Sequence, residues 1–448
     1  MKKTVIGILL LSLTATGWAR RPNIVFIVPD DMKQAHHGFI EGKALTPNID
    51  RLANEGVFFS RAYATTSVCT PSRFTSLTGR YASRCSTLDP KGTERVYNVQ
   101  WNTPLTDEVH TLPKVLQKAG YATGMVGKWH NGHPEGWHGL TQAFDKDDDP
   151  SDPKVAAKLK EMEDATKAYF YEQGFDYADG LVLGNLGSHF LRKLRYHNQE
   201  WFTQAAVDFI SQSKEKPFFL YMATTLMHGP NAVQSAKADP RATMFGYLDE
   251  AITVQPPRTD ALQRGLDAGH NPHDAAATWL DDGIGAIMTH LEKLGLAENT
   301  MIVYFNDHGT DVGKGSCYEG GVRTPSMIYW PGRIKPAVTD ALVQNTDFVP
   351  TILEACGVPM AADMVCDGKS LWPILDGRKK AVRKYAFCEM GYTRAVITPD
   401  WKYLAFRIPP SVVPTKEERR RKALKAQRWH LEREDRHVPA YPDAPLSH

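Results

Sequence analysis

Short apolar runs alternate with longer amphipathic segments along most of the chain. Residues 23–28, Asn-Ile-Val-Phe-Ile-Val, form a continuous β-branched run, which is typical of a strand buried on both faces. Similar runs predict further strands at 57–63, 122–126, 218–223, 301–305 and 326–330. Apolar spacings of three and four predict helices at 46–55, 111–119, 199–213, 275–294 and 347–355. This alternation predicts an α/β fold with a mostly parallel central sheet flanked by helices.

The pattern changes towards the end of the chain. Beyond about residue 382, short strand candidates precede a strongly basic helical stretch at 415–436. We therefore expect a smaller C-terminal α+β subdomain over 382–448, with antiparallel strands and a basic helix. A charge run of this kind is usually a solvated helix face, and the alternative is a surface that binds a polyanion. The strand candidates lie at 385–388, 395–398 and 403–406.

The first residues are typical of a secretory signal peptide. A basic start at Lys2 and Lys3 precedes an apolar run from Val5 to Leu13, and the small residues Gly17 and Ala19 occupy the −3 and −1 positions of a cleavage point after Ala19. We therefore expect 1–19 to be a signal peptide and 20–381 to be the main α/β domain. The mature protein would then be periplasmic or secreted.

Composition narrows the function classes. The 448 residues carry 53 Lys+Arg against 51 Asp+Glu, a formal charge of +2, which argues against a nucleic-acid partner. No later stretch reaches ~18 uninterrupted apolar residues, so no membrane span is expected. Six cysteines are too few for a disulfide scaffold. Cys356 and Cys366 are near enough in sequence to pair, or Cys356 is a buried helical residue.

Four polar clusters each follow a predicted strand closely. They are Asp30-Asp31, 127–130 (Gly-Lys-Trp-His), 228–230 (His-Gly-Pro) and 306–308 (Asn-Asp-His). In an open α/β sheet, functional side chains gather beyond the carboxyl ends of the strands. The sequence therefore predicts that these clusters meet at one edge of one sheet.

The carboxylates and the imidazole of these clusters suit a hard cation. Asp30, Asp31, Asp307 and His308 offer mainly oxygen ligands, which favours Ca²⁺ or Mg²⁺ over zinc. Adjacent Asp residues converge only where the chain turns, and Pro29 makes a turn plausible. We expect Asn306 to be a hydrogen-bonding neighbour and not a ligand.

A second acidic stretch, 145–149 (Asp-Lys-Asp-Asp-Asp), imitates the start of a calcium loop. Pro150 stands where such a loop needs glycine, and Ala156 stands where it needs a bidentate glutamate. We expect a solvated acidic turn.

Cys69 follows a predicted strand and precedes Pro71, at the start of a predicted helix. Its thiol is either a nucleophile activated by the helix N-terminus and Arg73, or an inert buried side chain. The residues alone leave both interpretations open.

The segment around Cys69 resembles the signature of type I sulfatases of the alkaline phosphatase superfamily. Residues 69–73 (Cys-Thr-Pro-Ser-Arg) are followed by 77–80 (Leu-Thr-Gly-Arg). The similarity continues over about 21–378, and it implies an alkaline-phosphatase-like sheet and a sulfuric ester hydrolase. Other matching segments are 22–31, 46–53, 111–121, 127–130, 174–176, 307–309, 313–315, 318–323 and 367–371.

The resemblance implies the chemistry of the site. Cys69 would be oxidised by a formylglycine-generating maturation enzyme to Cα-formylglycine, whose hydrate attacks sulfur. One Ca²⁺ would be held by Asp30, Asp31, Asp307 and His308 and would also contact the modified Cys69.

The remaining roles also follow from the resemblance. Arg73 and Lys128 would stabilise the hydrate, and Lys128 and Lys314 would bind sulfate oxygens. His228 and Lys314 would protonate the leaving alcohol, and His130 would take a proton from the second hydroxyl of the hydrate. A sulfated carbohydrate is the implied substrate. A phosphodiesterase or phosphonate monoester hydrolase, or an inactive glycan-binding member, are the alternatives.

The resemblance assigns no role to some residues near these motifs. His36 and His37 either touch substrate or lie on a surface loop, whereas Trp129 and Tyr318 are expected to pack. The segment 131–173 is longer than in many relatives. We expect one of its aromatic side chains, from His133, Trp137 and His138, to line a sugar-binding entrance.

Overall fold

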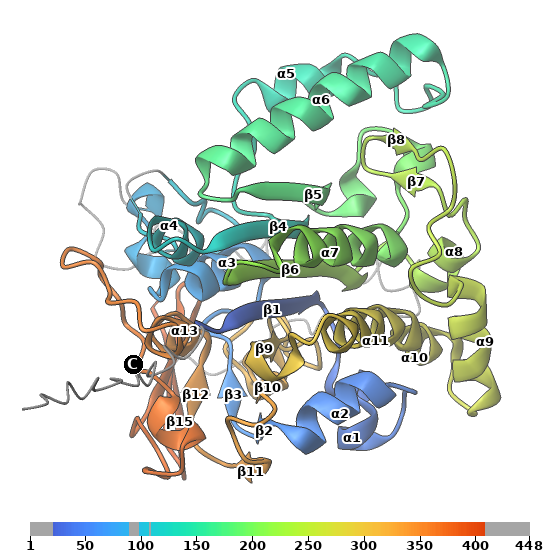
Figure 1. Cartoon of the computed structure of the whole chain (residues 1–448). Coiled ribbons are helices and arrows are strands. Elements are labelled where there is room, and N and C mark those ends of the chain that lie inside the picture. Colours follow the sequence, from blue (N-terminus) through green and yellow to red (C-terminus); the bar gives the residue numbers. More distant parts are fainter. Residues whose placement is uncertain (1–20, 89–97, 107–108, 408–448) are drawn as a thin grey trace, which may run out of the picture.

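The computed structural model describes residues 21–88, 98–106 and 109–407. An eight-stranded sheet with the order β11-β2-β10-β9-β1-β6-β4-β5 crosses the molecule (Figure 1). The run β9-β1-β6-β4-β5 is parallel, and β10 joins β9 and β2 antiparallel. The strands are β1 (Asn23–Asp30), β2 (Val57–Phe59), β4 (Ala122–Lys128), β5 (Tyr177–Val182), β6 (Phe218–Met227), β9 (Thr300–Phe305), β10 (Ser326–Tyr329) and β11 (Ala337–Thr339). The predicted mostly parallel sheet is confirmed.

Helices cover both faces of this sheet. On one face α7 packs against β6, where the Phe209 and Phe218 rings lie 5.7 Å apart. On the other, Phe348 of α13 lies 5.5 Å from the Phe26 ring of β1. The helices are α1 (Gly38–Glu41), α2 (Pro47–Glu55), α3 (Cys69–Thr78), α4 (Leu112–Lys118), α5 (Trp137–Gln142), α6 (Pro153–Glu172), α7 (Gln199–Ser213), α8 (Ala232–Ala236), α9 (Arg258–Asp267), α10 (Pro272–Ala275), α11 (Ala277–Lys293), α12 (Glu319–Val322), α13 (Phe348–Ala355) and α14 (Trp372–Leu375).

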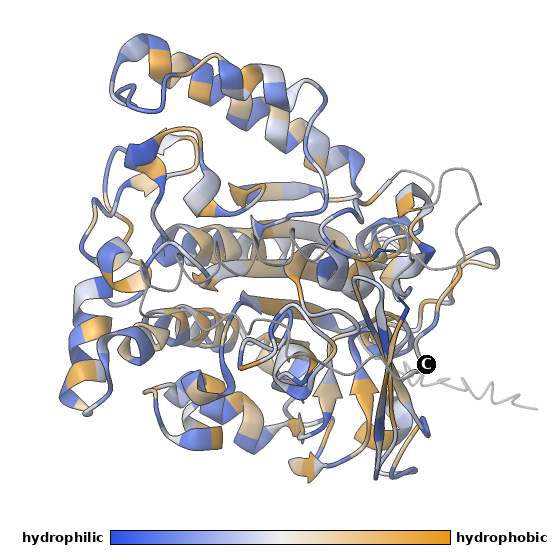
Figure 2. Cartoon of the chain, turned by 180° about the vertical axis from the view of Figure 1, so that it is seen from behind, coloured by the Kyte–Doolittle hydropathy of each residue, from blue (hydrophilic) through white to orange (hydrophobic). Residues whose placement is uncertain are grey.

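Burial follows the apolar runs of the sequence. Every residue of β1, β6 and β9 is buried. The sheet strands are mostly orange or pale in Figure 2, whereas the outer helices alternate between blue and orange. A helix with one solvent-exposed face has an amphipathic sequence, and a strand covered on both faces has a continuously apolar one.

A three-stranded antiparallel sheet forms the last described part of the chain. It contains β13 (Ala386–Met390), β14 (Thr393–Ile397) and β15 (Lys402–Phe406), as the short apolar runs predicted. Its inner face shares a small core with Tyr63, Val68 and Cys317. The predicted basic helix at 415–436 and the predicted signal peptide lie outside the described residues. The boundary near 382 stays a prediction.

Two expectations need correction. The run 57–63 is not one strand, because the chain turns after β2 and resumes as β3 (Ala62–Tyr63), which pairs with β12 (Val343–Gln344). Cys356 and Cys366 do not pair, since all six cysteines are free. The long segment 131–173 is largely helical, forming α5 and α6. A short hairpin of β7 (Ala242–Thr243) and β8 (Gly246–Tyr247) completes the strands.

A buried carboxylate on α11 caps the N-terminus of α2. Asp281 Oδ1 accepts from the backbone N–H of Ile49 at 2.8 Å, and Oδ2 accepts from the backbone and side chain of Asn48. Burial raises the pKa of Asp281 to about 7. This side chain therefore joins two helices that are more than 220 residues apart in sequence.

Replacing Asp281 with alanine should destabilise the fold. Asp281→Ala leaves the buried donors of α2 without acceptors, which we expect to lower the free energy of unfolding by about 1–3 kcal/mol. Urea denaturation followed by circular dichroism measures this change. Asp164→Ala, which removes an exposed ion pair with Lys160 on α6, should change stability by less than about 0.5 kcal/mol. Equal losses in the two variants would contradict the capping role.

Candidate functional site

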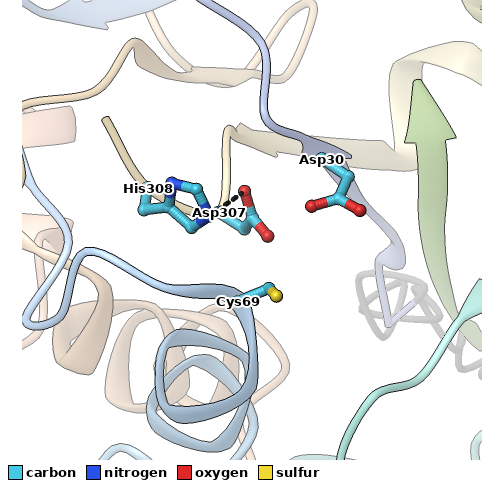
Figure 3. A group of neighbouring side chains, drawn as sticks. All are labelled: Asp30, Cys69, Asp307 and His308. Atoms are coloured by element: carbon cyan, nitrogen blue, oxygen red, sulfur yellow. Dashed lines mark ion pairs between the residues drawn. The ribbon is translucent and has the colours of Figure 1, made fainter. Parts of the chain in front are cut away.

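Side chains from β1, β9 and α3 meet beyond the carboxyl end of the sheet. Ligand atoms of Asp30, Cys69, Asp307 and His308 all lie within 4.8 Å of one another, and all four residues are buried. Figure 3 shows the two carboxylates, the imidazole and the sulfur turned towards one shared space. The backbone N–H of Asp307 donates to Pro29 O at 3.1 Å and so fixes the two strand ends against each other. The predicted convergence is confirmed for these residues.

Unusual backbone conformations aim several of these side chains. Asp31 and His130 both have φ of 62°, in the left-handed region that non-glycine residues rarely adopt. Gly127 has φ of 91°, and a Cβ there would meet Ala223 O at 1.8 Å, so only glycine fits between Val126 and Lys128. The turn that separates Asp30 from Asp31 thus occurs at Asp31 and not at Pro29, which stays within β1.

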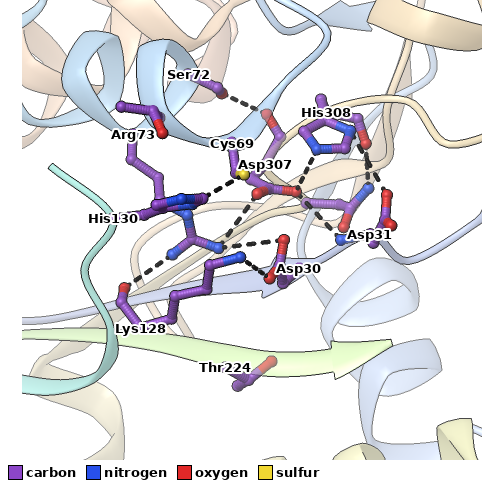
Figure 4. Close-up of polar contacts among 12 residues, drawn as sticks. Asp30, Asp31, Cys69, Ser72, Arg73, Lys128, His130, Thr224, Asp307 and His308 are labelled. Carbon is purple, nitrogen blue, oxygen red and sulfur yellow. Dashed lines mark hydrogen bonds and ion pairs between the residues drawn. The ribbon is translucent and has the colours of Figure 1, made fainter. Parts of the chain in front are cut away.

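Cys69 begins α3 at the centre of the site. Its Sγ lies 3.0 Å from His130 Nδ1 (Figure 4). Burial alone would raise the pKa of Cys69, but Lys128 and His130 hold it well below the usual value. Asn345 fixes the helix from behind, because its amide donates to Ser72 O at 3.0 Å and accepts from the N–H of Thr65. The thiol is therefore a buried but electrostatically activated group.

The donor set around Cys69 fits a hard divalent cation. Asp30 Oδ1 and His308 Nε2 are buried and have no hydrogen-bond partner, although buried polar atoms are normally satisfied. Burial raises the pKa of Asp307. Burial alone would lower the pKa of His308, but the Asp307 carboxylate raises it. A divalent cation there would favour the ionised carboxylate and the neutral imidazole, and it would contact the two ligand atoms that lack hydrogen-bond partners.

Three cationic side chains surround the carboxylates, and Figure 4 shows two of them, Arg73 and Lys128. Lys128 Nζ pairs with Asp30 Oδ2, and Arg73 Nη2 donates to Asp307 Oδ2 at 3.2 Å. Lys314 Nζ pairs with both oxygens of Asp31. Burial alone would raise the pKa of Asp30, yet Lys128 keeps it well below its usual value.

Asp31 differs from the other predicted ligands. Its carboxylate is turned to Lys314, and it is absent from the tight group of four around Cys69. Its Oδ1 lies 3.9 Å from His308 Nδ1. Asp31 therefore lies beside the group of four, and its role as a metal ligand stays a prediction.

His228 lies at the rim of the same centre, in the loop that follows β6. Burial lowers its pKa, while Asp30 and Asp31 act in the opposite direction. Its Nδ1 lies 2.9 Å from Gly229 O, which can only accept, so Nδ1 carries a proton and Nε2 is the free ring nitrogen. A negatively charged ligand would add to the two carboxylates in favouring the protonated ring.

Several neighbouring residues have structural roles. Asn306 bonds to the backbone of Met32 through both amide atoms, as expected of a hydrogen-bonding neighbour. Trp129 packs against Phe170 with ring centroids 5.2 Å apart, as expected. Tyr318 is 40% exposed, so the expectation that it packs in the interior is wrong.

The histidines after the Asp pair are buried and not on the surface. His37 Nε2 lies 2.8 Å from Tyr304 Oη, and His36 Nε2 lies 3.2 Å from Asp274 Oδ1. Both imidazoles are occupied by these internal contacts. The structure therefore supports neither a surface loop nor a substrate contact.

The long segment after His130 gives mixed outcomes. Trp137 is buried with its ring 6.5 Å from Phe190, so it is the least suited of the three candidates to line an entrance. His133 and His138 are exposed, with their rings 4.7 Å apart, and their substrate role stays a prediction.

The acidic turn at 145–149 is exposed, as predicted. Asp147 pairs with Arg192, and Asp149 pairs with Lys193. Neighbouring cations thus balance these carboxylates.

Sequence patterns missed several polar residues around the centre. Asn185 Oδ1 accepts from Lys128 Nζ at 2.6 Å, and Asn131 donates to Thr70 O at 2.9 Å. Asn345 and His197 also support the centre from behind. None of them belongs to a motif, and only tertiary contacts bring them close.

The chain is similar to proteins of a known family. The family model described as Sulfatase matches residues 22–358. Human arylsulfatase A is 32% identical over 413 residues, covering 86% of this chain and 74% of the relative. Rat N-acetylgalactosamine-6-sulfatase is 29% identical over 396 residues, covering 82% and 68%.

Solved structures share the fold. One described under the metabolism of multiple glycosaminoglycans by Bacteroides thetaiotaomicron has a TM-score of 0.62 at 24% identity, covering 88% of this chain and 90% of that one. A phosphonate monoester hydrolase from Silicibacter pomeroyi has a TM-score of 0.54 at 19% identity, covering 92% and 95%. The family match over most of the chain shows that it belongs to the sulfatase family and is a sulfuric ester hydrolase.

Proposed function

We propose that this sulfatase removes sulfate from a sulfated carbohydrate, with Cys69 converted to Cα-formylglycine and one Ca²⁺ bound. The observation that carries the proposal is the convergence of Cys69 with Asp30, Asp307 and His308 within 4.8 Å in a buried setting. The names of the relatives, among them N-acetylgalactosamine-6-sulfatase, support a sugar sulfate as substrate.

Modification of Cys69 answers a chemical need. A cysteine or serine that attacked sulfur directly would leave a sulfated side chain that water must hydrolyse. A hydrated aldehyde at position 69 would supply two hydroxyls on one carbon, so that one attacks sulfur and deprotonation of the other expels sulfate. His130 is suited to take that proton, because its Nδ1 lies 3.0 Å from the atom now at the Cys69 γ position.

The metal would be held by Asp30, Asp31, Asp307, His308 and the modified Cys69. A bound Ca²⁺ would supply positive charge against the negative oxygens of the sulfuryl group. Asp30 Oδ1 and His308 Nε2, two buried ligand atoms without a hydrogen-bond partner, support this donor set.

The fixed cations would act on the same charge. Arg73 and Lys128 are almost fully buried, and Arg73 also donates to Lys128 O at 3.0 Å, so the two are held as one unit. Preorganised cations of this kind stabilise developing charge without reorganisation. Lys314 is half-exposed beside Asp31, where it can reach sulfate oxygens.

The leaving alcohol needs a proton. His228 can donate one from Nε2, since its Nδ1 is committed to Gly229 O. Lys314 is the second candidate donor, and Asp31 helps keep its ammonium charged because pairing outweighs the effect of burial on its pKa.

Two further proposals concern the export and the maturation of the protein. Residues 1–19 would export it to the periplasm or beyond the cell, and a formylglycine-generating enzyme would modify Cys69. Among the described residues, no helix has the length and apolarity that a membrane crossing requires.

Modification of Cys69 can be tested by mass spectrometry. The peptide containing Cys69, made in a host with the maturation enzyme, should be about 18 Da lighter than the thiol form, because an aldehyde oxygen replaces sulfur and two hydrogens. Cys69→Ala should abolish activity while thermal unfolding stays near wild type. Cys366→Ala, at a half-buried free cysteine, should keep activity and the modification. Full activity with an unmodified thiol would refute the mechanism.

Specific metal binding at the site can be distinguished from nonspecific binding to acidic residues elsewhere. Chelation followed by dialysis should remove one Ca²⁺ per chain and abolish activity, and added Ca²⁺ should restore both. Asp30→Ala should lower the bound Ca²⁺ measured by atomic emission, whereas Asp149→Ala in the acidic turn should not. Unchanged Ca²⁺ content in the Asp30 variant would place the metal elsewhere.

A substrate panel separates the proposed function from its alternatives. We expect turnover of 4-nitrophenyl sulfate and of at least one sulfated monosaccharide or oligosaccharide, faster than that of a bis-aryl phosphate or a phosphonate monoester. The phosphonate monoester hydrolase of the same fold makes this comparison necessary. Faster phosphoryl than sulfuryl turnover would reverse the assignment. Binding of glycan without any turnover would indicate an inactive member.

A further inference from the structure

A fully buried histidine outside the proposed machinery supports the loop that carries His228. His197 precedes α7, and its Nε2 lies 2.9 Å from both His228 O and Pro230 O. Its Nδ1 lies 2.8 Å from Thr225 Oγ1 at the end of β6. One imidazole therefore contacts three points on the segment 225–230.

The protonation state of His197 follows from its partners. Carbonyl oxygens only accept, so Nε2 carries the hydrogen, and Nδ1 accepts from the Thr225 hydroxyl. Burial lowers the pKa of His197 to about 4, which keeps the ring neutral near neutral pH. A neutral ring with this tautomer satisfies all these contacts at once.

A second layer holds His197 itself in place. Arg258, which is 4% exposed, donates to His197 O at 3.3 Å and to the Asn198 side chain at 3.0 Å. Its guanidinium also forms two hydrogen bonds with Glu200 and lies 4.7 Å from the Trp279 ring. A buried, fully paired network of this kind is rigid, so His197 is a fixed support for the loop.

The supported loop determines the direction of the His228 ring. His228 Nδ1 donates to Gly229 O, within the segment whose carbonyls on either side bond to His197. The backbone N–H of His228 also donates to Thr225 O at 3.1 Å. A shift of these carbonyls would therefore turn Nε2 of His228 away from the leaving group.

We propose that His197 is a positioning residue that orients His228 for proton donation to the leaving alcohol. This inference rests on the proposed role of His228. The effect should depend on the substrate, since a 4-nitrophenolate leaves without a proton, whereas phenol and 4-methoxyphenol are poorer leaving groups that gain from one.

Two variants of similar size separate the contacts of His197. His197→Gln can place an amide N–H near the position of Nε2 and keep a bond to the loop carbonyls. His197→Asn is shorter and keeps only a partner for Thr225. His189 provides matched controls, because it is also buried and has a pKa that burial lowers to about 4. Its Nε2 donates to Met244 O at 2.9 Å, and its Nδ1 accepts from the backbone N–H of Leu191 at 3.0 Å. Its bonds go to Leu191 and Met244, away from the His228 loop.

The readout is kcat and KM for 4-nitrophenyl, phenyl and 4-methoxyphenyl sulfate. For His197→Asn, kcat on the two poorer leaving groups should fall about tenfold to hundredfold, with 4-nitrophenyl sulfate changing much less and KM nearly constant. His197→Gln should recover most of the loss. His189→Asn and His189→Gln should leave the leaving-group dependence as in wild type, and melting temperatures report folding in each variant.

His228→Ala separates the two layers of the proposal. If His228→Ala itself shows no steeper leaving-group dependence, the proposed acid is wrong. If it does but folded His197→Asn does not, the positioning role is wrong. An equal loss on all three sulfates in His197→Asn would indicate a merely structural residue and would also overturn the inference.

Discussion

Burial of several charges at one end of the sheet constrains everything around it. Asp30, Asp307 and Arg73 have essentially no exposed surface, and Lys128 has 1%. Removing such groups from water costs several kcal/mol each unless opposite charges and hydrogen bonds surround them. The strand ends, the start of α3 and the loops must therefore hold these groups in fixed positions.

The surrounding architecture meets this demand through short-range backbone devices. Gly127 allows β4 to pass Ala223 O closely enough to bring Lys128 under Asp30. Asn345 ties the first turn of α3 to Thr65, so Cys69 cannot drift from His130. The left-handed conformations of Asp31 and His130 lie where the side chains serve chemistry, in keeping with strain stored at functional sites.

The sequence predicted the strands and most of the site because these follow local patterns. The apolar runs of β1 and β9 are long and unbroken, and the polar clusters that end them are adjacent in sequence. The turn within 57–63 was missed because the run is apolar on both sides of it. Tyr318 was misjudged because burial depends on tertiary neighbours that no spacing shows. His197 and Asn345 carry no motif, so only the folded chain reveals them.

The C-terminal sheet extends this dependence to the exposed side of the site. Cys317, three residues after Lys314, is fully buried against Cys388 and Ala395 in a core shared with β13 and β14. Glu319 accepts from Tyr63 Oη at 2.8 Å and pairs with Lys402 of β15 at 3.0 Å. The segment that follows Lys314 is thus held between β3 and the last strands. Strands β13 to β15 lie beyond the residues that match the family model, yet they contact the segment that carries Lys314.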